Sequence, residues 1–263
     1  MSSASRRSFI RTGCWPWAHR TAERGGPSVQ ETRQVAGNNP QQREYNYAHF
    51  SLQQYKPERP SGPQVGQPAP DFAAQTLSGE RVHLADFKGQ IVVLETGSMT
   101  CPVYVGKITR MQQLVSRHPE ARFLVLYVRE AHPGGRIPQH TSLKQKRRCA
   151  ERLVSEEGEK RLILVDELDG QAHQAYGLLP DMAYVINAAG LIAYRASWND
   201  PDELDGVLEQ LKSKRSLTVG ESRKFVPSPQ ALLRTLRRAG WRAVLDFFVA
   251  MPKMVWLHFV KGQ

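Results

Sequence analysis

Short apolar runs alternate with amphipathic segments through the centre of this 263-residue sequence, and this alternation limits the possible folds. The runs at 91–94, 123–128 and 162–165 are continuously apolar, as expected for strands that are buried on both faces of a sheet. Helical patterns at 102–118 and 143–154 lie between them. This order predicts an α/β domain in which helices flank both faces of a mixed central sheet.

Shorter signals extend this sheet at both ends. Turn residues between apolar segments predict a leading hairpin at 72–84 and a second hairpin at 183–194. A final helix is expected after Asp200, because Asp200 suits the N-cap, Pro201 suits the first helical position and Glu203 completes a capping box. The sheet is therefore expected to end with a β-hairpin followed by a helix.

Composition divides the chain into three parts. Residues 1–64 are basic, poor in aliphatic side chains and rich in Gln, Pro, Ser and Gly, so we expect a mostly disordered leader and linker. An aromatic cluster within it, at 45–55, is expected to pack onto the domain. Residues 65–212 form the predicted domain, and 213–263 form a basic linker with a helical extension.

The extension has a helical pattern over 231–260, interrupted at Pro252. Apolar side chains share this segment with several arginines. Two interpretations fit: a helical hairpin that docks on the domain or on a second subunit, and an amphipathic element that lies on an anionic membrane surface. The pattern favours the docked hairpin.

The formal net charge of +11 resides in the two flanks, since residues 65–210 carry slightly more acidic than basic side chains. We therefore expect no nucleic-acid partner. No stretch reaches the roughly 18–20 apolar residues of a membrane span. Residues 5–11 resemble a twin-arginine export motif, but charged residues follow where such a signal has an apolar region, so export is not expected and a cytoplasmic location is.

The three cysteines, Cys14, Cys101 and Cys149, form neither a CxxC pair nor a Cys/His metal-binding pattern. They are too few and too widely spaced for a disulfide scaffold, which is consistent with a reducing compartment. We expect no metal site.

Residues 95–102 carry the candidate chemistry, because they place a single cysteine between a buried strand and a helix. Pro102 suits the first helical position, so Cys101 falls at the N-cap, where free N–H groups and the helix dipole favour a thiolate. We therefore expect a lowered pKa for Cys101. Ser98 and Thr100 can donate hydrogen bonds to its sulfur. A lone cysteine is more often a small buried hydrophobe, and the surrounding pattern favours the reactive thiol.

Polar residues also follow the next strand, at 127–135. Ligands bind at the carboxyl ends of strands in open α/β sheets, so Glu130 and His132 are expected near Cys101. His132 can move a proton to or from a leaving group, and Glu130 can orient it. The alternative is a surface loop with a capping glutamate and an exposed histidine. His140 is a weaker candidate further along.

Together these motifs resemble the iodothyronine deiodinase family. They occur in the family's order and at similar spacing: Gly-Ser-Met-Thr-Cys-Pro at 97–102, Glu-Ala-His-Pro-Gly at 130–134, Ile-Pro-Gln-His-Thr-Ser-Leu at 137–143, Val-Asp at 165–166 and Ala-Tyr-Gly at 175–177. The resemblance covers about 91–211 and follows a peroxiredoxin-like segment at 65–84. It implies a thioredoxin-like fold, and the family's members are often homodimers.

The resemblance also implies functional positions. Cys101 stands where animal members have selenocysteine, and the family's active site maps onto Ser98, Thr100, Glu130, His132 and His140. Asp181 stands where thioredoxins have a cis-proline, a position that tends to be acidic in deiodinases, so Asp181 is a secondary or substrate-binding candidate.

The sequence departs from the family at three places. Sulfur replaces selenium at Cys101, and sulfur is less acidic and a poorer leaving group. Met99 replaces a cysteine that the family often carries, which removes the nearest resolving thiol. Residues 194–198 replace a Gly-Gly-Arg-Gly stretch, so iodothyronine specificity is not implied.

These observations predict a thiol-dependent oxidoreductase without a bound cofactor. The Cys101 thiolate is expected to attack a hydroperoxide, a disulfide or the halogen of a halogenated aromatic, and an external thiol such as thioredoxin or glutathione is expected to regenerate it. Antioxidant peroxide or disulfide reduction suits a protein of bacterial appearance, whereas the resemblance keeps dehalogenation open. Cys149 either resolves the oxidised Cys101 or packs in the core.

The alternative function is a non-catalytic redox-sensing or binding module. In this interpretation the thioredoxin-like domain reports on its environment through Cys101, and the basic C-terminal helices set its location. A peripheral membrane contact through 231–260 belongs to either function.

Overall fold

A computed structural model describes residues 44–50, 62–213 and 226–256 of the chain. The strands among them are β1 (Ala73–Thr76), β2 (Arg81–His83), β3 (Ile91–Gly97), β4 (Ala121–Tyr127), β5 (Leu162–Val165), β6 (Ala183–Ile186) and β7 (Ile192–Ala196). The helices are the 3-10 turn η1 (Leu84–Phe87), α2 (Pro102–Arg117), α3 (Leu143–Glu157), α4 (Gln171–Ala175), α5 (Pro201–Lys212), α6 (Pro229–Ala239) and α7 (Trp241–Val255).

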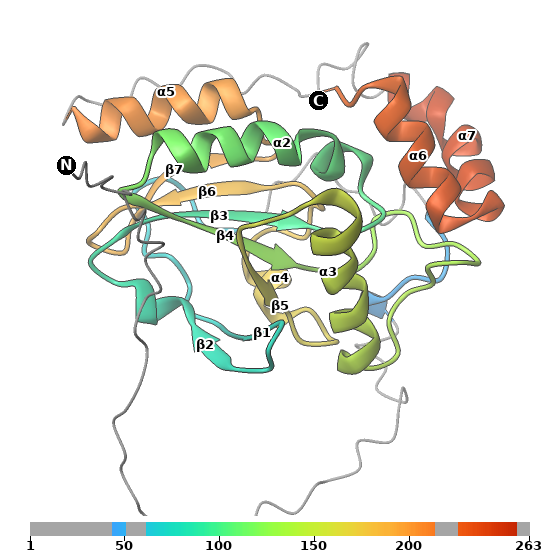
Figure 1. The fold of residues 1–263 in the computed structure, drawn as a ribbon, viewed down its shortest axis with the longest axis horizontal. Coiled ribbons are helices and arrows are strands. Elements are labelled where there is room, and N and C mark those ends of the chain that lie inside the picture. Colours follow the sequence, from blue (N-terminus) through green and yellow to red (C-terminus); the bar gives the residue numbers. More distant parts are fainter. Residues whose placement is uncertain (1–43, 51–61, 214–225, 257–263) are drawn as a thin grey trace, which may run out of the picture. The chain divides into compact units, whose positions relative to one another are not determined.

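The seven strands form one mixed sheet in the order β2-β1-β5-β4-β3-β6-β7 (Figure 1). Strands β3, β4 and β5 are parallel, and Gly97 at the end of β3 lies opposite Tyr127 at the end of β4. The outer pairs are antiparallel. A parallel β-α-β unit followed by an antiparallel hairpin and a helix is the thioredoxin-like arrangement, so the predicted fold class is confirmed. The parallel register brings the ends of β3 and β4 together.

The predicted strand positions agree closely with the structure, and the largest difference lies at β3. The apolar run predicts 91–94, but β3 continues to Gly97, because Glu95 pairs in register with Val125 on one side and Ala183 on the other. A glutamate usually ends a buried strand. Here the Arg161 guanidinium donates to the Glu95 carboxylate, which makes its burial tolerable.

The sheet carries a core on each face, as predicted. Helices α2, α3 and α5 cover one face and pack on Val93, Phe123, Val125, Ile163 and Val185. The residues of η1 and α4 cover the other face and pack on Val92, Leu94, Leu124, Leu126 and Leu164. The side chains of a strand alternate between the two faces, so continuous apolar runs are what two covered faces require.

The C-terminal extension folds as two helices that break at Gly240 and not at Pro252, so the predicted interruption is wrong. Gly240 has a φ of 114°, which a side chain with a Cβ rarely adopts, and α6 ends there. Pro252 lies inside α7. Its side chain is exposed, and water can satisfy the carbonyl group that the proline ring leaves without a donor.

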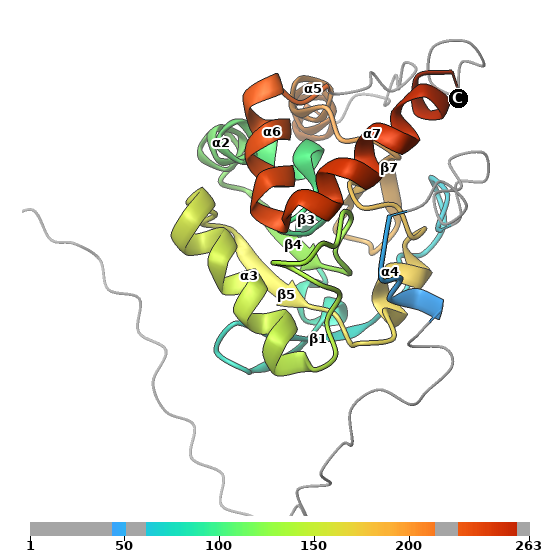
Figure 2. The same cartoon turned by 90° about the vertical axis from the view of Figure 1, so that its right-hand side faces the viewer.

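Helix α6 lies against α2 and next to the end of α3, as Figure 2 shows. Arg238 binds Glu156 at 3.0 Å and also Glu157, and Arg234 donates to Glu157 at 2.9 Å. The Ala239 carbonyl accepts from the Arg136 N–H at 2.9 Å. These contacts correspond to the docked interpretation of the extension. Among the residues that the structure describes, no helix combines the length and apolar character that a membrane span requires.

The segment 44–50 packs against the domain, as expected for its aromatic cluster. The Tyr45 hydroxyl lies 2.8 Å from Nδ1 of His173, and the Tyr47 hydroxyl donates to the Ala131 carbonyl at 2.9 Å. The Arg129 guanidinium stacks 4.8 Å from the Tyr45 ring centre and 4.7 Å from that of Tyr47. Part of the predicted leader thus contributes to the folded domain.

Other predictions for the leader fall on residues outside the described ranges. They include the export-like motif at 5–11, Cys14 and Tyr55. The domain boundaries at 64–65 and 212–213 also remain predictions.

Two adjacent glycines give a matched test of the α6 docking. A Cβ at Gly134 would lie 2.4 Å from the Ala239 carbonyl oxygen, whereas a Cβ at Gly135 would meet nothing within 4 Å. Gly134→Ala is expected to lower the unfolding free energy by about 1–3 kcal/mol and to speed hydrogen exchange in α6. Gly135→Ala is expected to change neither. Urea unfolding and amide exchange measure both effects, and equal behaviour of the two variants would contradict the docking.

Candidate active site

Cys101 caps the start of α2, as the sequence predicts. Its backbone is extended at φ −92° and ψ 108°, and Pro102 follows at the first helical position. The N–H groups of Tyr104 and Val103 lie close enough to its sulfur to lower its pKa and favour the thiolate, although neither makes a capping hydrogen bond to it. The side chain is 2% exposed, so the sulfur is enclosed by protein.

The expected fall in the pKa of Cys101 is wrong for this closed structure. Burial, followed by the nearby Asp181 carboxylate, raises its pKa to about 12. The Tyr104 N–H, the Lys107 ammonium and the Val103 N–H lower it and do not offset the burial. The N–H groups at the start of α2 do lower the pKa of Cys101, as the sequence predicts. The sequence pattern does not show that the thiol is buried away from water.

Ser98 and Thr100 hold the neighbouring loop, and neither makes the predicted hydrogen bond to the sulfur. Ser98 Oγ accepts from the Ala131 N–H at 3.1 Å. Thr100 Oγ1 accepts from the His132 N–H at 3.1 Å and donates to Glu130 at 2.6 Å. The two hydroxyls therefore fasten the segment after β4 to the turn that carries Cys101.

The Glu130 carboxylate is the centre of this arrangement. One oxygen accepts from both the Thr100 N–H, at 2.9 Å, and the Thr100 hydroxyl. The other accepts from the Tyr127 hydroxyl and lies 3.0 Å from Nε2 of His140. The side chain is fully buried, and burial alone would raise its pKa. The nearby His140 ring and the hydrogen bonds from Thr100 and Tyr127 together outweigh the burial, so the pKa of Glu130 is lowered.

Glu130 does not orient His132, which corrects the predicted pairing. The His132 ring instead lies against two aromatic rings, with its centre 4.4 Å from that of Phe50 and 5.8 Å from that of Phe247. Burial lowers the pKa of His132 to about 4, so the ring is neutral at physiological pH. Its Nδ1 is buried and has no hydrogen-bond partner among the described residues.

Asp181 belongs to a second buried polar cluster. The Lys107 ammonium donates to both Asp181 oxygens at 2.6 Å and to the Asn199 carbonyl at 2.9 Å, and it lies 3.2 Å from Glu95. Burial raises the pKa of Asp181 to about 7, against the opposing effect of Lys107. Because Asp181 and Lys107 both act on the pKa of Cys101, this cluster contributes to the electrostatics of the thiol.

The sequence interpretation missed Glu95, Lys107 and Tyr127. For Glu95 and Lys107 a signal was present. Glu95 is charged inside a strand that is otherwise apolar, and Lys107 stands in the apolar stripe of α2 next to Ile108. A charge on a buried face is rare unless it is paired, so it points to a polar cluster. Tyr127 gave no comparable signal, because a tyrosine suits a buried strand.

Among the described residues, Glu130, His140 and Cys149 place potential metal-ligand atoms within 4.8 Å of one another. Both Glu130 oxygens already accept hydrogen bonds. Burial and the Glu130 charge raise the pKa of Cys149 to about 12, so a metal ion would have to displace the thiol proton in order to bind there. In this structure Glu130 forms a hydrogen-bonded cluster with Thr100 and Tyr127, and the absence of a metal site remains a prediction.

Cys149 is half-buried and unpaired. Its neighbours on α3, Ala150 and Leu153, are fully buried, as the helical pattern predicts. The role of Cys149 as a resolving thiol remains a prediction.

An aromatic cover closes the site. Tyr47 and Phe50 come from the segment before the domain and Phe247 comes from α7, and together they pack on the loop that carries Ala131 and His132. Tyr47 also lies close enough to Cys101 for the charge of the thiolate to raise the pKa of Tyr47. Two segments from opposite ends of the sequence therefore enclose the loop beside the thiol.

Comparison with known proteins relates this site to one family. A family model described as iodothyronine deiodinase matches residues 33–212. The type I iodothyronine deiodinase of Xenopus laevis is 31% identical over 163 residues, which cover 56% of this chain and 64% of the relative. The thyroxine 5-deiodinase of Ovis aries is 29% identical over 143 residues, which cover 49% and 48%. The chain thus spans about half to two thirds of the length of these relatives.

A solved structure supports the fold. The crystal structure of an uncharacterized conserved protein from Geobacillus kaustophilus superposes with a TM-score of 0.50 at 18% sequence identity, covering 61% of this chain and 87% of that one. At this level of identity the likeness concerns the fold alone.

The Glu130 hydrogen bonds predict a pH-dependent loss of stability. Glu130→Gln replaces an acceptor oxygen by a donor, and we expect it to lower the unfolding free energy by about 2 kcal/mol at pH 7. Because the pKa of Glu130 is lowered in the fold, its contribution is present above the unfolded value near 4.3 and fades as the pH falls through the folded pKa. In urea unfolding, the difference between the two proteins should therefore narrow once the pH is lowered from 7 to below the unfolded value near 4.3. The exposed Glu151→Gln is the control, and a gap that persists at low pH would contradict the assignment.

Because the aromatic cover keeps water from Cys101, we expect the thiol to be alkylated slowly at neutral pH. In a Cys14→Ser/Cys149→Ser background, iodoacetamide should alkylate Cys101 with an apparent pKa well above the ordinary 8.5. Tyr47→Ala should lower that apparent pKa by hydrating the thiol, and each pKa unit gives about tenfold in rate at neutral pH. Tyr47→Phe keeps the ring and should stay close to the parent. An apparent pKa at or below 8.5 in the parent protein would overturn the closed site.

Proposed function

Because this chain belongs to the iodothyronine deiodinase family, we propose that it is a thiol-dependent oxidoreductase whose nucleophile is Cys101. The observation that supports this most is the position of Cys101 at the start of α2, where two helix N–H groups face its sulfur. The loop that carries His132 is fastened to the same turn through Thr100. A nucleophile, a stabilising helix start and a proton carrier thus lie on adjoining segments.

The proposed reaction reduces an electrophile and oxidises Cys101. With a hydroperoxide, the thiolate attacks the terminal oxygen, the O–O bond breaks, and the leaving alkoxide takes a proton to give an alcohol and a sulfenic acid. With a halogenated aromatic, the thiolate attacks the halogen and the carbon–halogen bond breaks, which leaves a sulfenyl halide on Cys101. The ring carbon takes a proton and gives the dehalogenated aromatic.

An external thiol then restores the enzyme. The first equivalent displaces water or halide and forms a mixed disulfide with Cys101, and the second releases Cys101 together with an oxidised disulfide. With a disulfide substrate, the cycle begins at the mixed disulfide. Thioredoxin or glutathione fits this role, since Met99 stands where a nearby resolving thiol would be. The proposal needs no bound cofactor.

His132 is the proposed proton carrier. Its pKa of about 4 keeps the imidazole neutral, and we expect it to accept the Cys101 proton and return it to the leaving group once water reaches the site, since hydration raises the pKa of His132 and lowers that of Cys101. Its unpartnered Nδ1 is free to do so among the described residues. Glu130 and Thr100 act as positioning residues, because they bind the loop of His132 and not its ring.

The closed site also supports a second candidate function, a redox-sensing or binding module. A thiol with a pKa near 12 is a poor nucleophile at pH 7. If the cover over Cys101 opens rarely, the protein reacts with oxidants too slowly for catalytic turnover. Oxidation of Cys101 would then act as a signal that an oxidant is present. Steady-state turnover separates the two functions.

A turnover screen tests the proposal. The purified chain is given hydroperoxides and iodinated phenols, with dithiothreitol and then thioredoxin as reductant. We expect turnover with at least one substrate class, complete loss in Cys101→Ser, and at least half of the rate in Cys149→Ser. Turnover that survives Cys101→Ser would exclude Cys101 as the nucleophile. Stoichiometric oxidation without turnover would favour the sensing module.

Three further predictions accompany this proposal. We expect the protein to be cytoplasmic, to form homodimers and to bind no nucleic acid. Antioxidant activity is the physiological role we propose if the hydroperoxide is the better substrate.

A further inference from the structure

Helix α7 exposes an apolar stripe to solvent. Trp241 is 72% exposed, Leu245 48%, Phe248 57% and Val249 76%. At 100° per residue these four side chains fall within about a third of the helix circumference, and the exposed Trp256 continues the stripe. Ala243 and Ala250 are buried on the opposite side. The apolar side chains are therefore not distributed singly, as they are on most surfaces, but form one continuous face.

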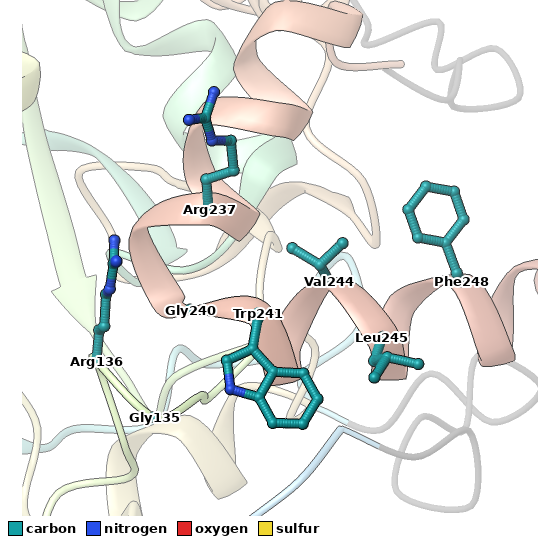
Figure 3. A pocket seen from close by; sticks show the side chains of 8 residues that line it. All are labelled: Gly135, Arg136, Arg237, Gly240, Trp241, Val244, Leu245 and Phe248. Atoms are coloured by element: carbon teal, nitrogen blue, oxygen red, sulfur yellow. The ribbon is translucent and has the colours of Figure 1, made fainter.

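Two arginine side chains lie at the Trp241 end of this stripe. Arg136 and Arg237 line a surface hollow of about 730 Å³ together with Trp241, Val244, Leu245 and Phe248 (Figure 3). Both arginines are exposed, and neither has an acidic partner among the described residues. Lys253 is also exposed near the other end of α7. The acid on this helix, Asp246, is already bound by Arg242 at 3.0 Å.

The stripe is held in place by the fold. Ala239 and Ala243 pack with Leu236, the Ala239 carbonyl accepts from the Arg136 N–H, and α6 is fixed to the end of α3 by its arginines. The exposed face is thus presented by an anchored helix and does not depend on an isolated helix forming in solution.

We propose that the exposed face of α7, with Arg136 and Arg237 beside it, binds an anionic membrane surface and lies in its interface. Tryptophan, phenylalanine and leucine on one face with arginine and lysine around it is the composition of interfacial helices, since the rings enter the headgroup region while the cations meet lipid phosphates. The inference concerns binding alone and is independent of the proposed reaction.

Charge favours a bilayer over a second copy of the chain. A symmetric dimer through this face would bring Arg136, Arg237 and Lys253 of both copies together, and like charges at an interface are unfavourable. An anionic surface neutralises the same residues, with roughly 1 kcal/mol for each cation near the surface.

Sedimentation of the full chain with lipid vesicles tests the proposal. One set contains phosphatidylcholine alone and the other contains about one third phosphatidylglycerol. We expect at least about tenfold tighter binding to the anionic set at low salt, and a weaker preference at 0.5 M NaCl because salt screens the charges.

Two double variants, each with a matched control variant, separate the apolar and the charged contributions. Trp241→Ser/Phe248→Ser should weaken binding to anionic vesicles by more than about tenfold, whereas Val65→Ser/Val154→Ser, at two exposed apolar sites elsewhere, should leave it unchanged. Arg136→Gln/Arg237→Gln should remove most of the anionic preference. Lys144→Gln/Arg148→Gln on the exposed side of α3 removes the same charge and should retain it.

Two kinds of result would overturn the proposal, one from the vesicle experiment and one from light scattering. The first is a folded protein, judged by circular dichroism, that does not sediment with anionic vesicles at low salt, or one whose Trp241→Ser/Phe248→Ser variant binds as tightly as the parent. The second is a concentration-dependent dimer in light scattering that the same variant abolishes while vesicles bind neither protein, since that would assign the face to a second copy.

Discussion

The hydrogen bonds to the buried Glu130 carboxylate fix the geometry of the whole site. They join the turn before α2 to the end of β4, and Nε2 of His140 lies 3.0 Å from the same carboxylate, so three parts of the chain meet at one group. A carboxylate without water is tolerated only when its oxygens are fully engaged. The position of Cys101 relative to His132 follows from this, because Thr100 binds Glu130 with its hydroxyl and His132 through the same oxygen.

A second set of buried charges lies behind the thiol and sets its electrostatics. Asp181 raises the pKa of Cys101 and Lys107 lowers it, while Lys107 is itself bound by Asp181 and Glu95. Burial is the largest of these influences on the pKa of Cys101, and the Asp181 charge adds to it, so the thiol stays protonated. The reactivity of Cys101 is therefore controlled by its access to water more than by any single charged neighbour.

The periodicity of the sequence predicts the helices and strands of this fold well, but it predicts the contacts between individual side chains poorly. The runs at 162–165 and 183–186 give β5 and β6 without error, because an apolar run between turn residues has one good solution in a sheet. The pairing of Glu130 with His140 in place of His132 depends on how a loop folds back, which spacing does not encode. The aromatic cluster predicts that Tyr47 and Phe50 pack on the domain. It does not predict that they cover the loop beside Cys101, because spacing does not show which part of the domain a distant segment contacts.

Helix α7 takes part in both the cover over the candidate site and the exposed apolar stripe. Its inner side places Phe247 against the His132 ring, and its outer side carries the exposed stripe that begins at Trp241. Hydration of the loop beneath Phe247 would raise the pKa of His132 from about 4 towards its ordinary value, and hydration of the neighbouring thiol would lower the pKa of Cys101 from about 12. Both changes favour proton transfer from the thiol to the imidazole. The packing of Phe247 on His132 and of Tyr47 beside Cys101 therefore opposes this transfer, since both side chains keep water away from the two groups.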